Sequence, residues 1–342
     1  MSADPSPGRG PLGRWAIPVG VLSAAAVSVV AAFRVSPWPA IRLIRLAFDA
    51  GAARTSAALA RHVPPGVESR LDIAYRPGDP QGTLDIHYPP GALSSGEPLP
   101  VVVWTHGGGF VSGDKSDITN YAKVLAGRGY VVVSVGYTIA PEATYPTPVR
   151  QLDAALGYLA AHAQELHLDP SRFALAGDSA GSQIAAQVAA LTTNPAYASR
   201  LGITPSLQPS QLRAMVLTCG VYDLDLVDPS SPAGRLFFAP VLWAYSGTRA
   251  ALTDEQFRTM SVTPHVTADF PASFITAGNA DPLLAHSTAL AARLEDVGVP
   301  VQTLFYPAVH SPALPHEYQF NLDSVDGRDA LERIDTFLHA TL

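Results

Sequence analysis

Residues 173–190 read FALAGDSAGSQIAAQVAA, and the rest of the chain is organised around this stretch. A short apolar run, Phe173–Ala176, is followed by the turn Gly177–Gly181 and then by small and apolar residues at helical spacing. A strand, a sharp turn and a helix are the context in which G-x-S-x-G forms a nucleophile elbow. We therefore predict that Ser179 presents its hydroxyl at the C-terminal edge of a parallel sheet. A Gly- and Ser-rich turn without chemistry is the alternative.

From residue 70 onward, predicted strands alternate with predicted helices. The continuous apolar run Val101–Trp104 is typical of a strand that is buried on both faces, and Tyr130–Val135 is the next predicted buried strand. This alternation favours a mainly parallel sheet with helices on both faces. The stretch 221–265, rich in Pro, Trp, Phe and Tyr, interrupts the alternation and has the size of an inserted cap. Further strands are predicted at 71–75, 84–88, 214–218, 273–276 and 301–305, and further helices at 118–128, 147–164, 287–297 and 325–342.

Three consecutive glycines, Gly107–Gly109, follow the predicted strand that ends at Trp104. Glycine costs conformational entropy, so three in a row need a reason. Free N–H groups in such a loop can donate to the oxyanion of a tetrahedral intermediate, the part that HGGG-type loops play in lipases and esterases. A flexible linker is the alternative, although linkers seldom interrupt a buried strand–helix unit. His106 precedes the serine in the chain, so we expect it to hydrogen-bond to the loop and not to act as a base.

The acid and the base of a triad follow the serine in this arrangement, in the order Ser, Asp or Glu, His. Asp281 stands after the predicted strand 273–276, and His310 stands five residues after the strand 301–305. The rival base is His316, six residues further on. Because a shorter tether reaches the sheet edge more easily, we predict that His310 is the base and that His316 packs or caps locally. Asp281 as a plain helix cap and His310 as an ordinary loop histidine are the alternatives.

Four segments together resemble the hormone-sensitive-lipase-like family of α/β-hydrolases, which contains bacterial esterases. The segments are HGGGF at 106–110, YTIAPEATYP at 137–146, GDSAG at 177–181 and ADPL at 280–283. The resemblance covers about residues 70–342. It implies an α/β-hydrolase fold, with a mainly parallel central sheet, helices on both faces and a helical cap.

The resemblance also implies a role for individual residues. It implies that Ser179 is the nucleophile, Asp281 the acid and His310 the base. The N–H groups of the loop glycines and of the residue after the serine form the oxyanion hole in this family; here they belong to Gly108, Gly109 and Ala180. The chain departs from the family pattern Y-P-G-x-x-H-x-F before His310, where the loop is one residue shorter and no Phe follows.

These motifs predict a serine carboxylic-ester hydrolase that acts on small or medium acyl esters and needs no metal or organic cofactor. A small-molecule receptor on the same fold, and a lipid or amide deacylase, are the alternatives. A receptor that has lost its base would not keep candidates for all three triad roles. The net charge of −7 and the absence of a dense Lys/Arg block argue against a nucleic-acid partner. The single cysteine, Cys219, excludes an intrachain disulfide.

The predicted catalytic domain, residues 70–342, is preceded by two other segments. Residues 1–36 contain Trp15–Phe33, a run without charge that is long enough to span a bilayer core as a helix. We therefore expect a protein anchored in the membrane by one N-terminal span, with secretion after signal cleavage as the alternative. Residues 37–69 form a predicted cap or linker, in which residues 38–62 have the apolar spacing of an amphipathic helix. That helix could lie on a membrane surface, cover the active site or simply pack.

Overall fold

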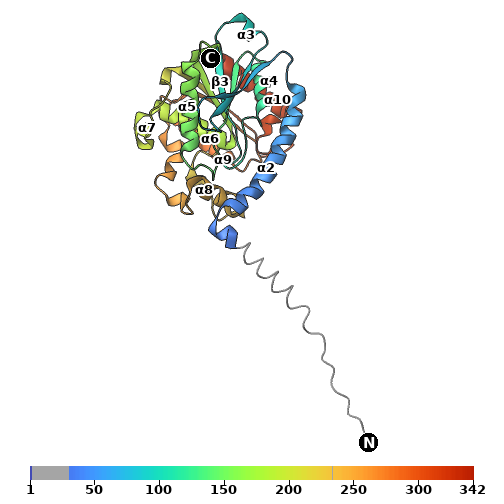
Figure 1. Ribbon diagram of the computed structural model, residues 1–342, viewed down its shortest axis with the longest axis vertical. Coiled ribbons are helices and arrows are strands. Elements are labelled where there is room, and N and C mark those ends of the chain that lie inside the picture. Colours follow the sequence, from blue (N-terminus) through green and yellow to red (C-terminus); the bar gives the residue numbers. More distant parts are fainter. Residues whose placement is uncertain (2–30, 233) are drawn as a thin grey trace.

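The computed structural model describes residue 1, residues 31–232 and residues 234–342. An eight-stranded sheet crosses it in the order β1-β2-β4-β3-β5-β6-β7-β8. Figure 1 shows β3 inside the fold with helices around it. β2 pairs antiparallel with β1 and with β4, and every pair from β4 to β8 is parallel. The predicted mainly parallel sheet is therefore confirmed. The strands are β1 (Glu68–Ala74), β2 (Thr83–Tyr88), β3 (Leu99–Thr105), β4 (Val131–Val135), β5 (Leu168–Asp178), β6 (Leu212–Thr218), β7 (Ala272–Ala277) and β8 (Val301–Phe305).

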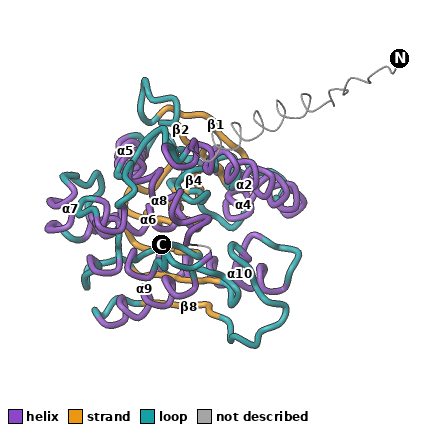
Figure 2. The backbone as a smooth tube through the Cα atoms, turned by 90° about the horizontal axis from the view of Figure 1, so that it is seen from below, coloured by secondary structure: helices purple, strands orange, loops and turns teal. Residues whose placement is uncertain are grey.

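Helices cover both faces of the sheet because its central strands are apolar on both faces. Val101 and Val103 of β3 belong to one core cluster with α5, α6 and α9, whereas Val102 and Trp104 belong to a second with α4 and α10. Successive side chains of a strand point to opposite faces, so one continuous apolar run contributes to two cores. Figure 2 shows the helices on either side of the sheet. They are α4 (Thr119–Ala126), α5 (Thr147–Ala161), α6 (Ser179–Thr193), α9 (Leu284–Asp296) and α10 (Val325–Thr341).

Two further segments meet above the C-terminal ends of the parallel strands. One is α2 (Trp38–Leu59), which packs on α4 and on α8 (Ala239–Ser246). The other is the stretch between β6 and β7, which contains α8 and the predicted insertion. The rings of Phe48 in α2 and Phe237 in the insertion lie 5.7 Å apart. The remaining elements are α3 (Ala92–Ser95), α7 (Pro195–Leu201) and the short helical turns Ala60–His62, Pro209–Gln211, Leu224–Leu226, Gly234–Phe238, Ala251–Thr253, Phe257–Met260, Thr263–His265 and Tyr318–Phe320.

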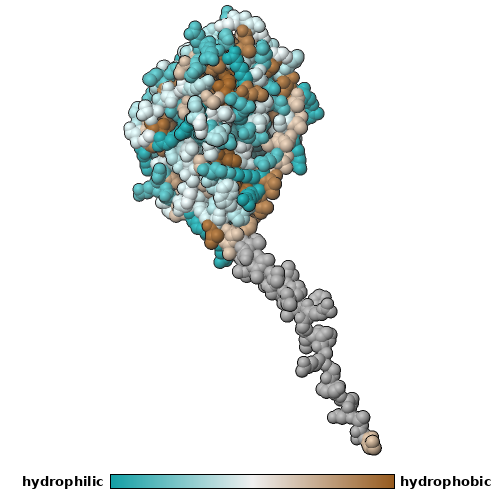
Figure 3. All heavy atoms as spheres, in the orientation of Figure 1, coloured by the Kyte–Doolittle hydropathy of each residue, from teal (hydrophilic) through white to brown (hydrophobic). Residues whose placement is uncertain are grey.

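The predicted membrane anchor has no support in the structure. Of the predicted span Trp15–Phe33, residues 15–30 lie outside the described residues. In the part of the chain that is described, no helix has both the length and the apolar character needed to cross a membrane. The helix that follows, α2, exposes Leu43 and Leu46, but charged residues lie among its apolar ones. Figure 3 shows apolar and polar residues mixed over this face of the molecule. We therefore correct the predicted membrane localisation and the predicted contact with a membrane.

Candidate active site

Ser179 lies in the tight turn between β5 and α6, and the turn depends on its glycines. Its φ of 51° falls in the left-handed region, which is costly for a residue with a side chain. A Cβ on Gly177 would lie 2.6 Å from the carbonyl carbon of Gly181. A Cβ on Gly181 would collide with the carbonyl oxygen of Thr105. Strand and helix can approach closely enough to hold Ser179 in this conformation only because both positions are glycine.

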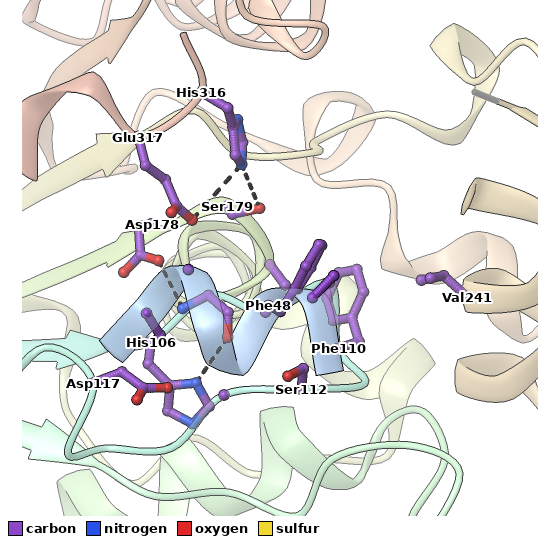
Figure 4. Close-up of a pocket in the computed structure, with 18 of the residues that line it drawn as sticks. Phe48, His106, Phe110, Ser112, Asp117, Asp178, Ser179, Val241, His316 and Glu317 are labelled. Atoms are coloured by element: carbon purple, nitrogen blue, oxygen red, sulfur yellow. Dashed lines mark hydrogen bonds and ion pairs between the residues drawn. The ribbon is translucent and has the colours of Figure 1, made fainter. Parts of the chain in front are cut away.

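His316 lies between Ser179 and Asp281. Its Nε2 is 2.9 Å from Ser179 Oγ, and its Nδ1 is 2.9 Å from Asp281 Oδ2. Figure 4 shows the imidazole above Ser179 with the first of these contacts dashed. Asp281 is buried and also accepts a hydrogen bond from the backbone N–H of Leu283, at 2.7 Å. A carboxylate on Nδ1 leaves Nε2 free to accept the serine proton, which is the geometry of general-base activation.

His310, which the sequence analysis assigned as the base, does not reach Ser179. Its Nε2 lies 3.0 Å from Asp326 of α10, and its ring packs on Tyr306 with 4.6 Å between the centroids. The position next to the serine belongs to His316 instead. The choice of His310 is therefore corrected, because the first half of the loop after β8 is held against α10.

The second half of that loop returns to the edge of β7. Leu314 donates its N–H to Asn279 Oδ1 at 2.7 Å, and its carbonyl accepts from the N–H of Ala280 at 3.0 Å. These two bonds fasten Leu314 to the turn that carries Asp281. His316 follows two residues later and so lies beside Asp281. The hydrogen bonds of the loop, and not its length, determine which histidine reaches the serine.

Several electrostatic contributions act on His316. Burial by itself lowers the pKa of the imidazole, but the Cys219 side chain, the hydrogen bond to Asp281 and the carboxylate of Glu317 outweigh it. The pKa of His316 is therefore held well above its usual value. The imidazolium that forms when the serine loses its proton is thus stabilised where it stands.

A buried carboxyl fixes the base of the glycine loop. Asp178 accepts from the N–H of Gly107 at 2.8 Å and from the indole N–H of Trp104 at 2.7 Å. His106 stacks on Tyr137 with 4.2 Å between the ring centroids, and its Nδ1 lies 2.8 Å from the carbonyl oxygen of Gly107. Burial lowers the pKa of His106, so its ring is neutral and supports the loop by packing and hydrogen bonding.

The three residues predicted to form an oxyanion hole, Gly108, Gly109 and Ala180, line the same cavity as Ser179. Gly108 and Gly109 have φ values of 110° and 61°, which L side chains rarely adopt. Among the hydrogen bonds of the described residues, the N–H groups of Gly108 and Gly109 have no acceptor. Ala180 lies in the first turn of α6, where N–H groups have no partner within the helix. This arrangement is suited to holding an oxyanion.

A cavity of about 560 Å³ opens above Ser179, between α2, the glycine loop and the insertion. This volume lies in the range of small-molecule sites, about 300–1,000 Å³. Its wall is mainly apolar, and α2 and the insertion both contribute to it. Three arrangements were considered for the predicted amphipathic helix. The structure shows that this helix, α2, covers the site. The aromatic lining residues are Phe48, Phe110, Phe237, Phe238 and Phe320.

Residues 102–314 match the model of a family described as having the α/β-hydrolase fold. The chain belongs to this family. Esterase LipI of Mycobacterium tuberculosis is 42% identical over 114 residues, 33% of this chain and 35% of LipI. Carboxylesterase NlhH of the same species is 41% identical over 133 residues, 37% of this chain and 41% of NlhH. The chain therefore spans only about a third to two fifths of the length of these curated relatives.

A solved structure extends the similarity to most of the chain. Esterase B from Lactobacillus rhamnosis superposes with a TM-score of 0.73 at 25% identity, covering 88% of this chain and 97% of esterase B. The predicted fold and the predicted resemblance to hormone-sensitive-lipase-like esterases are confirmed.

The sequence contains a signal that favours His316 over His310 as the base, and our prediction did not use it. The family pattern H-x-F places an aromatic residue two positions after the histidine. Tyr318 occupies that position after His316, and its hydroxyl contacts Thr276 of β7 at 2.6 Å. Pro312 stands at the same distance from His310. The aromatic residue that anchors the loop under the sheet would therefore have favoured His316.

One group of potential metal ligands lies within the same site. The donor atoms of Cys219, Asp281 and His316 are all within 4.8 Å of one another, a set that the sequence analysis did not recognise. Sulfur, imidazole and carboxylate are zinc donors. Asp281 and His316 are already hydrogen-bonded to each other, however, and burial raises the pKa of the Cys219 thiol. Among the described residues of the chain, these three are the ones whose side chains could hold a metal.

Proposed function

We propose that this hydrolase cleaves carboxylic esters with small or medium acyl groups. Ser179 is the nucleophile, His316 the base and Asp281 the acid. The observation that carries the proposal is the series of two 2.9 Å contacts from Ser179 Oγ through His316 to Asp281. The esterases among its relatives support ester hydrolysis.

The proposed reaction has two halves. His316 Nε2 takes the proton of Ser179 as Oγ attacks the ester carbonyl carbon. The carbonyl oxygen becomes an oxyanion that accepts from the N–H groups of Gly108, Gly109 and Ala180. When the intermediate collapses, the alcohol leaves with the proton from His316. Water then enters, loses a proton to His316 and attacks the acyl-enzyme, which releases the acid and restores the serine.

Active-site labelling combined with a substrate panel tests this function. A serine-reactive fluorophosphonate should modify Ser179, as located by peptide mass spectrometry, and should leave Ser179→Ala unmodified. Nitrophenyl esters of increasing acyl length should be hydrolysed up to the length that the cavity accommodates. A protein that binds esters without turnover and without labelling would instead be the receptor. A protein that cleaves anilides faster than the matching esters would be an amide deacylase.

A further inference from the structure

Glu317 lies beside the reacting groups but has no part in the triad. Its Oε1 is 3.8 Å from His316 Nε2, the nitrogen that contacts Ser179. Figure 4 shows the carboxyl pointing from its loop toward Ser179 and Asp178. The φ of Glu317 is 59°, a left-handed conformation that is uncommon for residues other than glycine. The backbone thus holds a carboxyl at the reaction centre in spite of a conformational cost.

Glu317 and Asp178 are neighbouring carboxyl groups that differ in exposure. Asp178 is 3% exposed, whereas the side chain of Glu317 is 36% exposed. Burial, and next the charge of Glu317, raise the pKa of Asp178 well above its usual value. Of these two neighbouring carboxyl groups, that of Glu317 is therefore the more accessible to a ligand in the cavity.

The rest of the cavity wall favours a positive charge over a negative one. Of the described residues that line it, none is Lys or Arg. Five phenylalanine rings surround the space, and aromatic faces attract cations. A carboxylate with aromatic rings in an apolar wall attracts an ammonium group and repels a carboxylate ligand. The acidic lining residues are Asp49, Asp117, Asp178 and Glu317.

The proposed reaction places the alcohol half of the ester next to Glu317. The leaving oxygen takes its proton from His316 Nε2, so it must come within about 2.6–3.2 Å of that nitrogen. Because Glu317 Oε1 is 3.8 Å from the same nitrogen, the leaving oxygen and this carboxylate approach a common atom, which brings the first atoms of the alcohol within reach of the carboxylate charge. We propose that Glu317 is a specificity-determining residue that favours esters whose alcohol carries a positively charged ammonium group close to the ester oxygen. This inference rests on the proposed ester hydrolysis.

Two esters of equal shape and different charge test the inference. Acetylcholine has a quaternary nitrogen where 3,3-dimethylbutyl acetate has a quaternary carbon. In the wild type, kcat/KM should be higher for the cationic ester, and the ratio of the two values should fall when salt is added. Glu317→Gln should lower this ratio on the order of tenfold. Glu97→Gln removes one charge at an exposed site outside the cavity and should leave the ratio unchanged.

The outcomes separate the specificity of the site from its activity. A ratio that is the same in the wild type and in Glu317→Gln overturns the inference, as does an equal loss of both activities, which would indicate a structural role. If Glu317→Gln does not fold, a wild-type ratio near one that salt does not change overturns it equally. If the wild type hydrolyses p-nitrophenyl acetate but does not prefer the cationic ester over the neutral one, this inference is contradicted and the proposed function is not. Failure to hydrolyse all three esters contradicts the proposed function and this inference with it.

Discussion

The nucleophile elbow and the loop that carries His316 reach the same reaction centre by different physical routes. The elbow carries its determinants within residues 177–181, namely the left-handed φ of Ser179 and two glycines, although Gly181 also has to fit against Thr105 at the end of β3. The base loop, residues 306–317, is positioned by partners that are distant in the sequence, Asn279 and Asp326. A motif whose geometry is local can be recognised in the sequence, whereas a residue placed by long-range contacts requires the fold.

The largest effect is expected at the elbow. Ser179→Ala removes the nucleophile and should lower kcat on p-nitrophenyl butyrate on the order of 10⁴-fold or more, because the remaining site can only bind and polarise the ester. Steady-state kinetics with the purified variant measure the loss. Turnover equal to that of the wild type would show that the elbow has no chemical role.

The steric basis of the elbow can be tested apart from its chemistry. Gly181→Ala forces a Cβ against backbone carbonyl oxygens and should lower the free energy of unfolding by about 3 kcal/mol. Gly51→Ala is the matched control, because no atom lies within 4 Å of a Cβ there and alanine favours the helix. Urea unfolding of both variants gives the comparison. Equal stabilities would argue that the turn can relax to accept a side chain.

Substitution of a residue that positions the base loop but takes no part in the chemistry should lower the activity. Asn279→Ala removes the acceptor of the Leu314 N–H, so His316 is less firmly placed, and kcat should fall on the order of 10- to 100-fold. Asn279→Asp keeps an acceptor oxygen and should retain more activity. Steady-state kinetics of the two variants give this difference. If both behave like the wild type, the loop is positioned by other contacts.

The smallest effect is a displacement of the pH profile. Burial lowers the pKa of His316, but Cys219, Asp281 and Glu317 raise it well above its usual value near 6.5, and the base acts only when it is unprotonated. The acid limb of kcat/KM should therefore lie above pH 6.5, with activity rising as pH increases. Asp281→Asn removes a stabilising negative charge and should move this limb to lower pH, besides reducing the rate. An unchanged limb would mean that another group controls it.

The sheet could be predicted from the sequence because its strands are buried on both faces. Val101–Trp104 and Phe173–Ala176 are continuous apolar runs, and both lie in strands. β5 begins earlier than predicted, at Leu168, because pairing of this residue with Leu99 of β3 extends the strand beyond its apolar part. Tertiary pairing thus changed the boundary of the element but not its type.

The active site was predictable to the extent that its residues are fixed locally. Ser179 and Asp281 were predicted from the strand ends that precede them, and both contact His316 in the structure. His310 was preferred over His316 on tether length, but contacts with α10 and with Asn279 determine the course of the loop. The predicted membrane span was wrong for a different reason, since an uncharged run is a compositional signal alone, and no helix of the described residues has the length and apolar character to cross a membrane.

The most direct test of the account compares His316→Ala with His310→Ala. Triad members act as a unit, so His316→Ala should lose kcat/KM to nearly the same extent as Ser179→Ala, on the order of 10⁴-fold. His310→Ala should keep most of the activity and lose some stability, because its contact with Asp326 holds only the outer half of the loop. An inactive His310→Ala beside an active His316→Ala would contradict the account.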